Sequence, residues 1–269
     1  MKWHPACKVL VVKLITSILI GLMAVPCLAE TNSLQEMIGR ANDQVAKFVE
    51  QFSEVKCTEH VLQEKFKADG KVELKDESTY DYLVILTNAG GEISLDESRL
   101  AIREGKKEPK KGVSMLVSNG FATLFLVFHP YYSSGFEFTD LGADTIGGHT
   151  FHKVQFKHIA GMRSPAALAL RGREYPLELA GVAWIEPATG IIGKIDAGLA
   201  SSMEDIGLKS MRSEVQFQPV PFANAKDVYW FPAQASVEVE TPRQHWRNTH
   251  DFTDYKRFSV STEEKVAAK

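Results

Sequence analysis

From Val55 onward the chain alternates apolar and polar residues in runs that turn signals separate at fairly regular intervals. Near the end of the chain, for example, Ala235, Val237 and Val239 alternate with serine and glutamate residues. Because successive side chains of a strand point to opposite faces, a period of two predicts strands that bury one face and expose the other. Runs of this kind, joined by short turns, predict a mainly antiparallel sheet.

About ten segments carry this strand pattern between turn residues. They occupy residues 55–67, 72–87, 92–103, 135–141, 149–159, 182–186, 191–197, 206–219, 228–240 and 244–260. Residues 161–179 interrupt the series because they contain Pro165 and Pro176, and we expect a long loop there with a helical turn at residues 166–170. The sequence of this loop between Arg163 and Tyr175 contains no pattern from which a role can be predicted.

Two segments have helical spacing instead. In residues 33–52 the apolar side chains recur every three or four positions, and Ser33 with Glu36 forms an S-x-x-E capping box at the start. Residues 113–128 are too long and too evenly apolar for one strand, and they end before a His-Pro pair. The sequence therefore predicts an α+β protein that is mainly antiparallel β, with one amphipathic helix before the sheet and one inserted after its third strand.

The first 29 residues have the layout of a secretory signal peptide. Three lysines precede an apolar run at residues 14–25. Pro26 ends this run, and Cys27-Leu28-Ala29 then provides a cleavage site. A transmembrane anchor is the alternative, but the apolar run is shorter than the roughly 20 residues that span a bilayer. We expect cleavage after Ala29, which leaves residues 30–269 as a single periplasmic or secreted domain without a membrane span.

Charge and cysteine content narrow the classes of partner. The chain has 31 basic and 34 acidic residues, and removal of the three leader lysines leaves 28 against 34, a formal net charge of −6. This balance disfavours nucleic acid and anionic membrane surfaces as partners. Cys57 is the one cysteine after residue 29, so no intramolecular disulfide is expected, and its alternating segment predicts a half-buried strand residue rather than a nucleophile.

The order of a signal peptide, an amphipathic helix and a long antiparallel meander interrupted by a second helix resembles the LolA/LolB-like lipoprotein carrier superfamily. The hairpin at residues 184–190, WIEPATG, is similar to a W-[IVL]-[DE]-x-x-[TS]-G turn that these proteins often carry. Residues 240–248, ETPRQHWRN, resemble a set of uncharacterised secreted bacterial proteins. The carrier resemblance implies an incomplete, half-closed β-barrel of about ten strands, with helices that plug its open side and an apolar concave face that receives acyl chains.

The helix predicted at residues 113–128 is the main candidate for ligand binding. Its aromatic surface, together with the hairpin tryptophan, suggests a lid over a lipid cavity, where apolar area and dispersion contacts hold acyl chains. The candidate ligand-binding residues are Phe121, Leu124, Phe125, Phe128, Tyr131 and Trp184. The alternative is an ordinary core helix that packs on the sheet.

Arg243, His245 and Arg247 share one face of a predicted strand and form a candidate site for an anionic headgroup. Arginine binds phosphate and carboxylate groups through a planar fork of donors. The alternative is a solvated strand face on which these three residues pair with acidic neighbours such as Glu238 and Glu240.

The residue patterns of metal sites and of common enzymes are missing. His149 and His152 are odd-spaced, as are His245 and His250, so neither pair shares a strand face, and no metal or cofactor is expected. No nucleophile elbow, P-loop or dinucleotide-binding glycine pattern occurs.

The sequence therefore predicts a carrier for a lipid or acylated ligand, without catalysis. Two alternatives stay open: a cell-envelope scaffold or sensor that binds a protein partner, and a hydrolase with a dispersed site.

Overall fold

The computed structural model describes residues 27–89, 92–102, 124–170, 172–222 and 228–258. Ten of its strands form one sheet: β1 (Val55–Phe66), β2 (Val72–Ala89), β3 (Glu92–Ala101), β4 (Phe136–Ile146), β5 (His149–His158), β8 (Leu179–Ile185), β9 (Ile192–Leu199), β10 (Ser210–Val220), β11 (Tyr229–Glu240) and β12 (His245–Arg257). All neighbouring pairs are antiparallel. The predicted antiparallel series is confirmed, with most strand ends within a few residues of the prediction.

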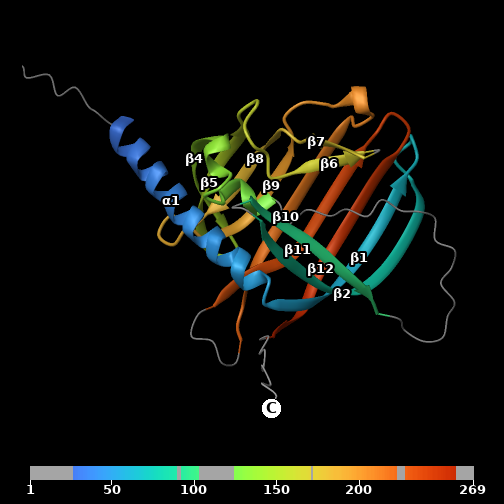
Figure 1. Ribbon diagram of the computed structural model, residues 1–269, viewed down its shortest axis with the longest axis horizontal. Helices are drawn as coiled ribbons and strands as arrows, with labels where there is room; N and C mark the ends of the chain where they lie inside the picture. Colours follow the sequence, from blue (N-terminus) through green and yellow to red (C-terminus); the bar gives the residue numbers. More distant parts are fainter. Residues whose placement is uncertain (1–26, 90–91, 103–123, 171, 223–227, 259–269) are drawn as a thin grey trace, which may run out of the picture.

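The sheet is curved but does not close. Its strand order is β3-β2-β1-β12-β11-β10-β9-β8-β5-β4, so β3 and β4 are edge strands that do not pair with each other. The helix α1 (Cys27–Phe52) crosses the open side of this sheet (Figure 1). An incomplete β-barrel with a helix over its opening is therefore confirmed.

Residues 161–179 contain strands where we expected a loop with a helical turn. β6 (Ala167–Leu170) and β7 (Arg173–Pro176) pair with each other in a separate two-stranded sheet. Gly172, at φ +74°, lies between them and supplies the positive φ that a tight reversal favours. The predicted helical turn is wrong because a run of four or five apolar residues fits a short strand as well as a helical turn.

The helical elements differ in part from the prediction. α1 is confirmed, but it begins at Cys27, so Ser33 lies inside the helix and the predicted capping box is wrong. Of the predicted second helix, residues 113–123 lie outside the described residues, and residues 124–128 form a short turn that ends in η1 (Leu126–Phe128). Two further 3-10 turns are η2 (Ser133–Gly135) and η3 (Glu204–Ile206). In the part of the chain that the structure describes, no helix combines the length and the apolar character needed to cross a membrane.

α1 buries one stripe of side chains against the inner face of the sheet, the face that lines the half-barrel. The stripe consists of Met37, Ala41, Val45, Val49 and Phe52, and each is at most 2 % exposed. Their spacing of three and four is that of one helix face. The strands present alternate residues to it, as the alternating burial of β1 shows. The hydrophobic core therefore lies between α1 and the inner face.

The turn between β8 and β9 holds α1 in place. Gly190 has φ +77°, and a Cβ there would lie 2.3 Å from the carbonyl carbon of Arg40, so the turn approaches the helix backbone only because this residue is glycine. Arg40 Nε donates a 2.7 Å hydrogen bond to the Pro187 carbonyl. Thr189 and Glu186 are hydrogen-bonded within the turn. The hairpin that carries the family resemblance thus docks the helix that covers the inner face.

The segment around η1 and η2 bridges the opening of the barrel. The Tyr132 hydroxyl donates a 3.0 Å hydrogen bond to the carbonyl of Ile93 on the edge strand β3. The amide of Asn42 on α1, oriented to satisfy its neighbours, donates to the Phe128 carbonyl over 2.8 Å and accepts from the Ser133 hydroxyl over 3.2 Å. This segment therefore connects the covering helix to an edge of the sheet.

Cys57 is more buried than expected, and we predict that it is unreactive in the folded protein. Its side chain is 2 % exposed on the inner face of β1, and burial raises the pKa of its thiol to about 12. The thiolate is the reacting form, so iodoacetamide at pH 8 should leave the native protein unlabelled and modify Cys57 in urea. Mass spectrometry measures both states, and labelling at equal rates with and without urea would contradict this environment.

Candidate functional site

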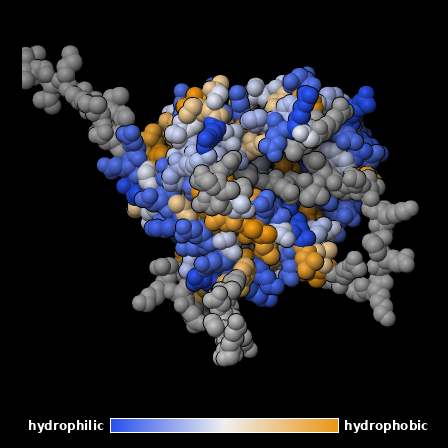
Figure 2. Space-filling model, in the orientation of Figure 1, coloured by the Kyte–Doolittle hydropathy of each residue, from blue (hydrophilic) through white to orange (hydrophobic). Residues whose placement is uncertain are grey.

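A pocket of about 380 Å³ opens between the second half of α1, the β8–β9 turn and the beginning of β11. Its apolar walls are formed by Val45, Phe48, Phe125, Ile192, Phe217 and Trp230. The volume lies within the range of about 300–1,000 Å³ that is typical of small-molecule sites. Figure 2 shows apolar surface gathered beside α1 on the face that this view presents. The pocket is therefore a candidate binding site for a hydrophobic ligand.

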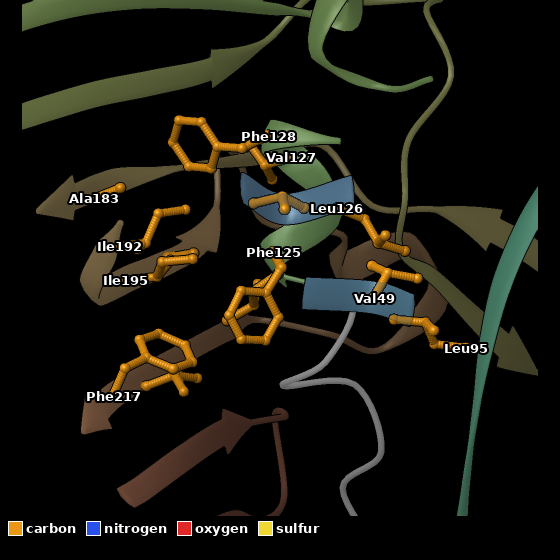
Figure 3. Close-up of a cluster of buried hydrophobic side chains, with 14 of the residues drawn as sticks. Val49, Leu95, Phe125, Leu126, Val127, Phe128, Ala183, Ile192, Ile195 and Phe217 are labelled. Carbon is orange, nitrogen blue, oxygen red and sulfur yellow. The ribbon is translucent and has the colours of Figure 1, made fainter. Parts of the chain in front are cut away.

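Aromatic rings from three separate parts of the chain meet at the wall of this pocket. The ring centroid of Phe125 lies 4.2 Å from that of Phe48 on α1 and 4.6 Å from that of Phe217 on β10. Figure 3 shows Phe125 pointing toward Phe217, whereas Phe128 points away from it. Deeper in the core, Phe48 contacts Phe231 at 5.8 Å. Contacts in this range are favourable for rings and present a continuous apolar surface to a ligand.

The rim of the pocket is polar and carries a positive charge. Gln44, Lys47 and Gln51 line it from successive turns of α1. Lys47 is exposed, and no carboxylate of the described residues forms an ion pair with it. An apolar pocket below a cationic and amide-bearing rim fits a ligand with a long apolar part and a polar or anionic end.

A buried ionic network occupies another part of the inner face. Glu59 on β1 accepts hydrogen bonds of 2.6 and 2.8 Å from Arg99 on β3 and one of 2.8 Å from His250 on β12. Arg99 also donates a 2.9 Å hydrogen bond to Glu97. The side chains of Glu59, Glu97 and Arg99 are 0, 2 and 11 % exposed. The network joins β1, β3 and β12 at the covered face of the sheet.

The partners of Glu59 determine its protonation. Burial alone raises the pKa of its carboxyl, but the hydrogen bonds from His250 and Arg99 and their charges outweigh burial and hold the pKa below its ordinary value. Burial of Arg99 opposes its charge, but Glu59 and Glu97 outweigh this and raise the pKa of its guanidinium. Both groups are therefore charged at neutral pH.

The candidate ligand-binding residues lie in different places. Phe121 lies outside the described residues. Phe125 lines the pocket, and Leu124 and Phe128 are buried in the core next to it. Tyr131 lines a separate pocket beside η2.

Trp184 lies on the outer face of β8, because its neighbours on either side point inward. Ala183 and Ile185 are fully buried on the inner face. The Trp184 indole nitrogen donates a 2.9 Å hydrogen bond to Asp144, and Lys194 lies 5.0 Å from the ring centroid. Trp184 thus stabilises strand pairing on the outer face and does not line the pocket.

Two of the candidate headgroup residues, His245 and Arg247, also lie on the outer face of the sheet. Trp246 and Asn248 point inward from β12, so the residues that alternate with them point outward. Glu238 Oε1 accepts a hydrogen bond of 2.5 Å from His245 Nε2. It accepts another, of 3.3 Å, from Arg247 Nη2. Arg243 is exposed. For His245 and Arg247 this arrangement matches the alternative of a solvated strand face paired with an acidic neighbour.

No protein-family model matches the chain, and no curated protein matches it significantly. Among solved structures, the chain is similar to a DUF1329 family protein from Desulfovibrio piger, with 12 % identity, a TM-score of 0.41, and coverage of 84 % of this chain and 95 % of that chain. It is also similar to a LolA superfamily protein from Nitrosomonas europaea, with 11 % identity, a TM-score of 0.35, and coverage of 86 % and 98 %.

A putative outer membrane lipoprotein-sorting protein domain from Vibrio parahaemolyticus has 13 % identity and a TM-score of 0.37, with coverage of 87 % of this chain and 96 % of that chain. Two of these structures carry the LolA superfamily or lipoprotein-sorting description, which is the family that the sequence resembles. At these identities and TM-scores the similarities carry no conclusion about this chain, and its half-barrel fold rests on its own strand order.

Proposed function

We propose that this protein is an exported binding or carrier protein that holds a single acyl chain or a similar hydrophobic ligand in the pocket beneath α1, without catalysis. The observation that supports the proposal is the pocket itself: aromatic walls from α1, from Phe125 just before η1 and from β10, below a rim that carries Lys47. Each buried methylene group contributes about 0.8 kcal/mol, so a chain of roughly ten carbons contributes about 8 kcal/mol. After an association cost of about 4 kcal/mol, this corresponds to an affinity on the order of millimolar.

The proposal includes export, because the first 29 residues have the layout of a signal peptide. We propose that the mature chain begins at Glu30 and works in the periplasm or outside the cell. The direct test is mass spectrometry of the protein purified natively from its own cell envelope. The intact mass gives the first residue, and an organic extract of the same sample gives the ligand. An extract without any hydrophobic compound, together with no binding of fluorescent fatty-acid probes, would contradict the carrier function.

A tryptophan at the rim should block the pocket without disturbing the fold. Gln44 is half-buried and lines the pocket, so Gln44→Trp places a large ring over its mouth. We expect the affinity for a fluorescent fatty-acid probe to fall about tenfold or more, because the apolar part of the probe loses its buried area. The change in folding free energy should stay within about 0.5 kcal/mol, as for most surface substitutions.

Gln35→Trp is the matched control, since Gln35 is an exposed glutamine of the same helix that does not line the pocket. It should leave probe binding unchanged. Equal loss of binding in both variants would mean that the probe binds elsewhere on α1 and would contradict the proposed site.

A further inference from the structure

A second pocket, of about 380 Å³, lies between η2 and the turn that follows β5. It is lined by Tyr131, Tyr132, Ser134, Gly135, Met162 and Arg163, together with the backbone at residue 161. None of these residues lines the pocket beneath α1. The proposed carrier function does not use this site, and the residues around it combine aromatic surface, a hydroxyl group and a cation.

Backbone contacts fix both walls of this second pocket. Gly161 has φ +81°, and the Met162 N–H donates a 3.1 Å hydrogen bond to the Ile159 carbonyl, which closes a tight turn. The Ile159 N–H in turn donates a 2.9 Å hydrogen bond to the carbonyl of Gly135. His158 Nε2 donates to the Arg163 carbonyl over 3.2 Å. The chain around Arg163 is therefore anchored to η2 before any ligand binds.

Arg163 is held over an aromatic ring with its charge uncompensated. Its guanidinium lies 4.9 Å from the ring centroid of Tyr131, a cation–π distance. Tyr131 in turn contacts Tyr132 edge to face, with ring centroids 4.8 Å apart. In the part of the chain that the structure describes, Arg163 forms no ion pair and the Ser134 hydroxyl has no hydrogen-bond partner. Stacking on a ring orients the planar fork of arginine and leaves its donors available to a planar or tetrahedral anion.

We propose that this second pocket binds a small organic anion, whose carboxylate or phosphate group accepts hydrogen bonds from Arg163 and Ser134 and whose apolar part packs on Tyr131 and Met162. Carboxylates and phosphates share the chemistry that an arginine fork recognises, and the aromatic wall selects against a bare inorganic ion. The site is independent of the acyl-chain pocket, since the two share no lining residue.

Calorimetric titration of the full mature chain with phenyl phosphate, benzoate and neutral benzamide tests the proposal. We expect both anions to bind with an affinity on the order of millimolar or better, and benzamide not to bind. The anion that binds more tightly shows whether the site prefers a phosphate or a carboxylate group. Arg163→Met should weaken anion binding about tenfold or more, because a charge-assisted hydrogen bond is lost, and Arg163→Lys should restore part of it.

Arg243→Met is the matched control, because Arg243 is an exposed arginine that does not line this pocket. It should bind both anions as the unaltered protein does. Absence of anion binding in the unaltered protein, or equal loss in the Arg163 and Arg243 variants, would overturn the site. Probe binding in the pocket beneath α1 should be unaffected by Arg163→Met, so failure of this proposal and failure of the carrier function are separate results.

Discussion

Replacement of Arg99 by methionine is expected to destabilise the fold by about 3–5 kcal/mol, because it removes the guanidinium that two buried carboxylates share. Glu59 and Glu97 are 0 and 2 % exposed and both accept hydrogen bonds from Arg99. Methionine fills similar space but provides no charge, so the loss is electrostatic rather than a loss of packing. Urea unfolding, followed by tryptophan fluorescence at neutral pH, measures the change.

Arg212→Met is the matched control for this prediction. Arg212 also forms a two-donor pair, with Asp196, but its side chain is 70 % exposed. Solvent screens such a pair, so its loss should cost at most about 1 kcal/mol. If Arg99→Met does not accumulate, the double variant with Glu59→Gln should, because it removes the more buried of the two carboxylates. Equal stability of the Arg99 and Arg212 variants would contradict the inferred burial of the network.

The effect of Arg99→Met should shrink as the pH falls. In the unaltered protein the folded pKa of Glu59 lies below its ordinary value, so its stabilisation is fully present above the unfolded pKa and is lost as the pH falls through the folded pKa. Without the hydrogen bonds and charge of Arg99, burial raises the pKa of the Glu59 carboxyl, so this group takes up a proton in the folded state at a higher pH. The difference between the two proteins should therefore fall between pH 7 and about pH 4, and a constant difference over that range would contradict the assignment.

The fold was largely predictable because the strands bury one face only. Alternation located the strands, and turn residues such as Gly190 separated them. The pairing order was not predictable from periodicity, since β1, the first strand in the sequence, pairs with β12, the last. The short strand β6 was missed because four residues of apolar sequence carry no period that distinguishes strand from helix.

The candidate site was only partly predictable, because its residues come together from distant parts of the sequence. Phe125 was a candidate and lines the pocket, but Phe48 and Phe217, which also line it, were not among the candidate residues. The face of Trp184 follows from alternation with its buried neighbours, a signal that the sequence does contain.

The buried network also left a signal in the sequence. Glu59 falls in phase with Val55, Cys57 and Val61, the inward positions of β1. An acidic residue in an otherwise apolar strand face requires a partner. Only the register of the sheet, however, shows that the partners are Arg99 and His250.

Replacement of Phe125 by aspartate should separate a ligand-binding wall from an ordinary core position. Phe125 is 3 % exposed, and its ring contacts Phe48 and Phe217. Loss of these contacts alone should cost about 3–5 kcal/mol, as for other large core truncations. The carboxylate, however, lies at a pocket that opens to solvent, so it can be hydrated there. We expect a folded, strongly destabilised protein that no longer binds a fluorescent fatty-acid probe.

Phe128→Asp provides the comparison within the same turn. Phe128 is fully buried, packs against Phe138 and Phe156, and does not line the pocket, so its carboxylate would have no access to water. This variant should fail to accumulate, because an unpaired buried charge costs more than the fold can tolerate. Phe125→Leu should fold and retain part of the probe binding, since it keeps an apolar wall. Unchanged probe binding in folded Phe125→Asp would contradict the proposal that Phe125 contacts the ligand. Failure of Phe125→Asp to fold, combined with full probe binding in Phe125→Leu, would instead make Phe125 a core residue that happens to border an opening.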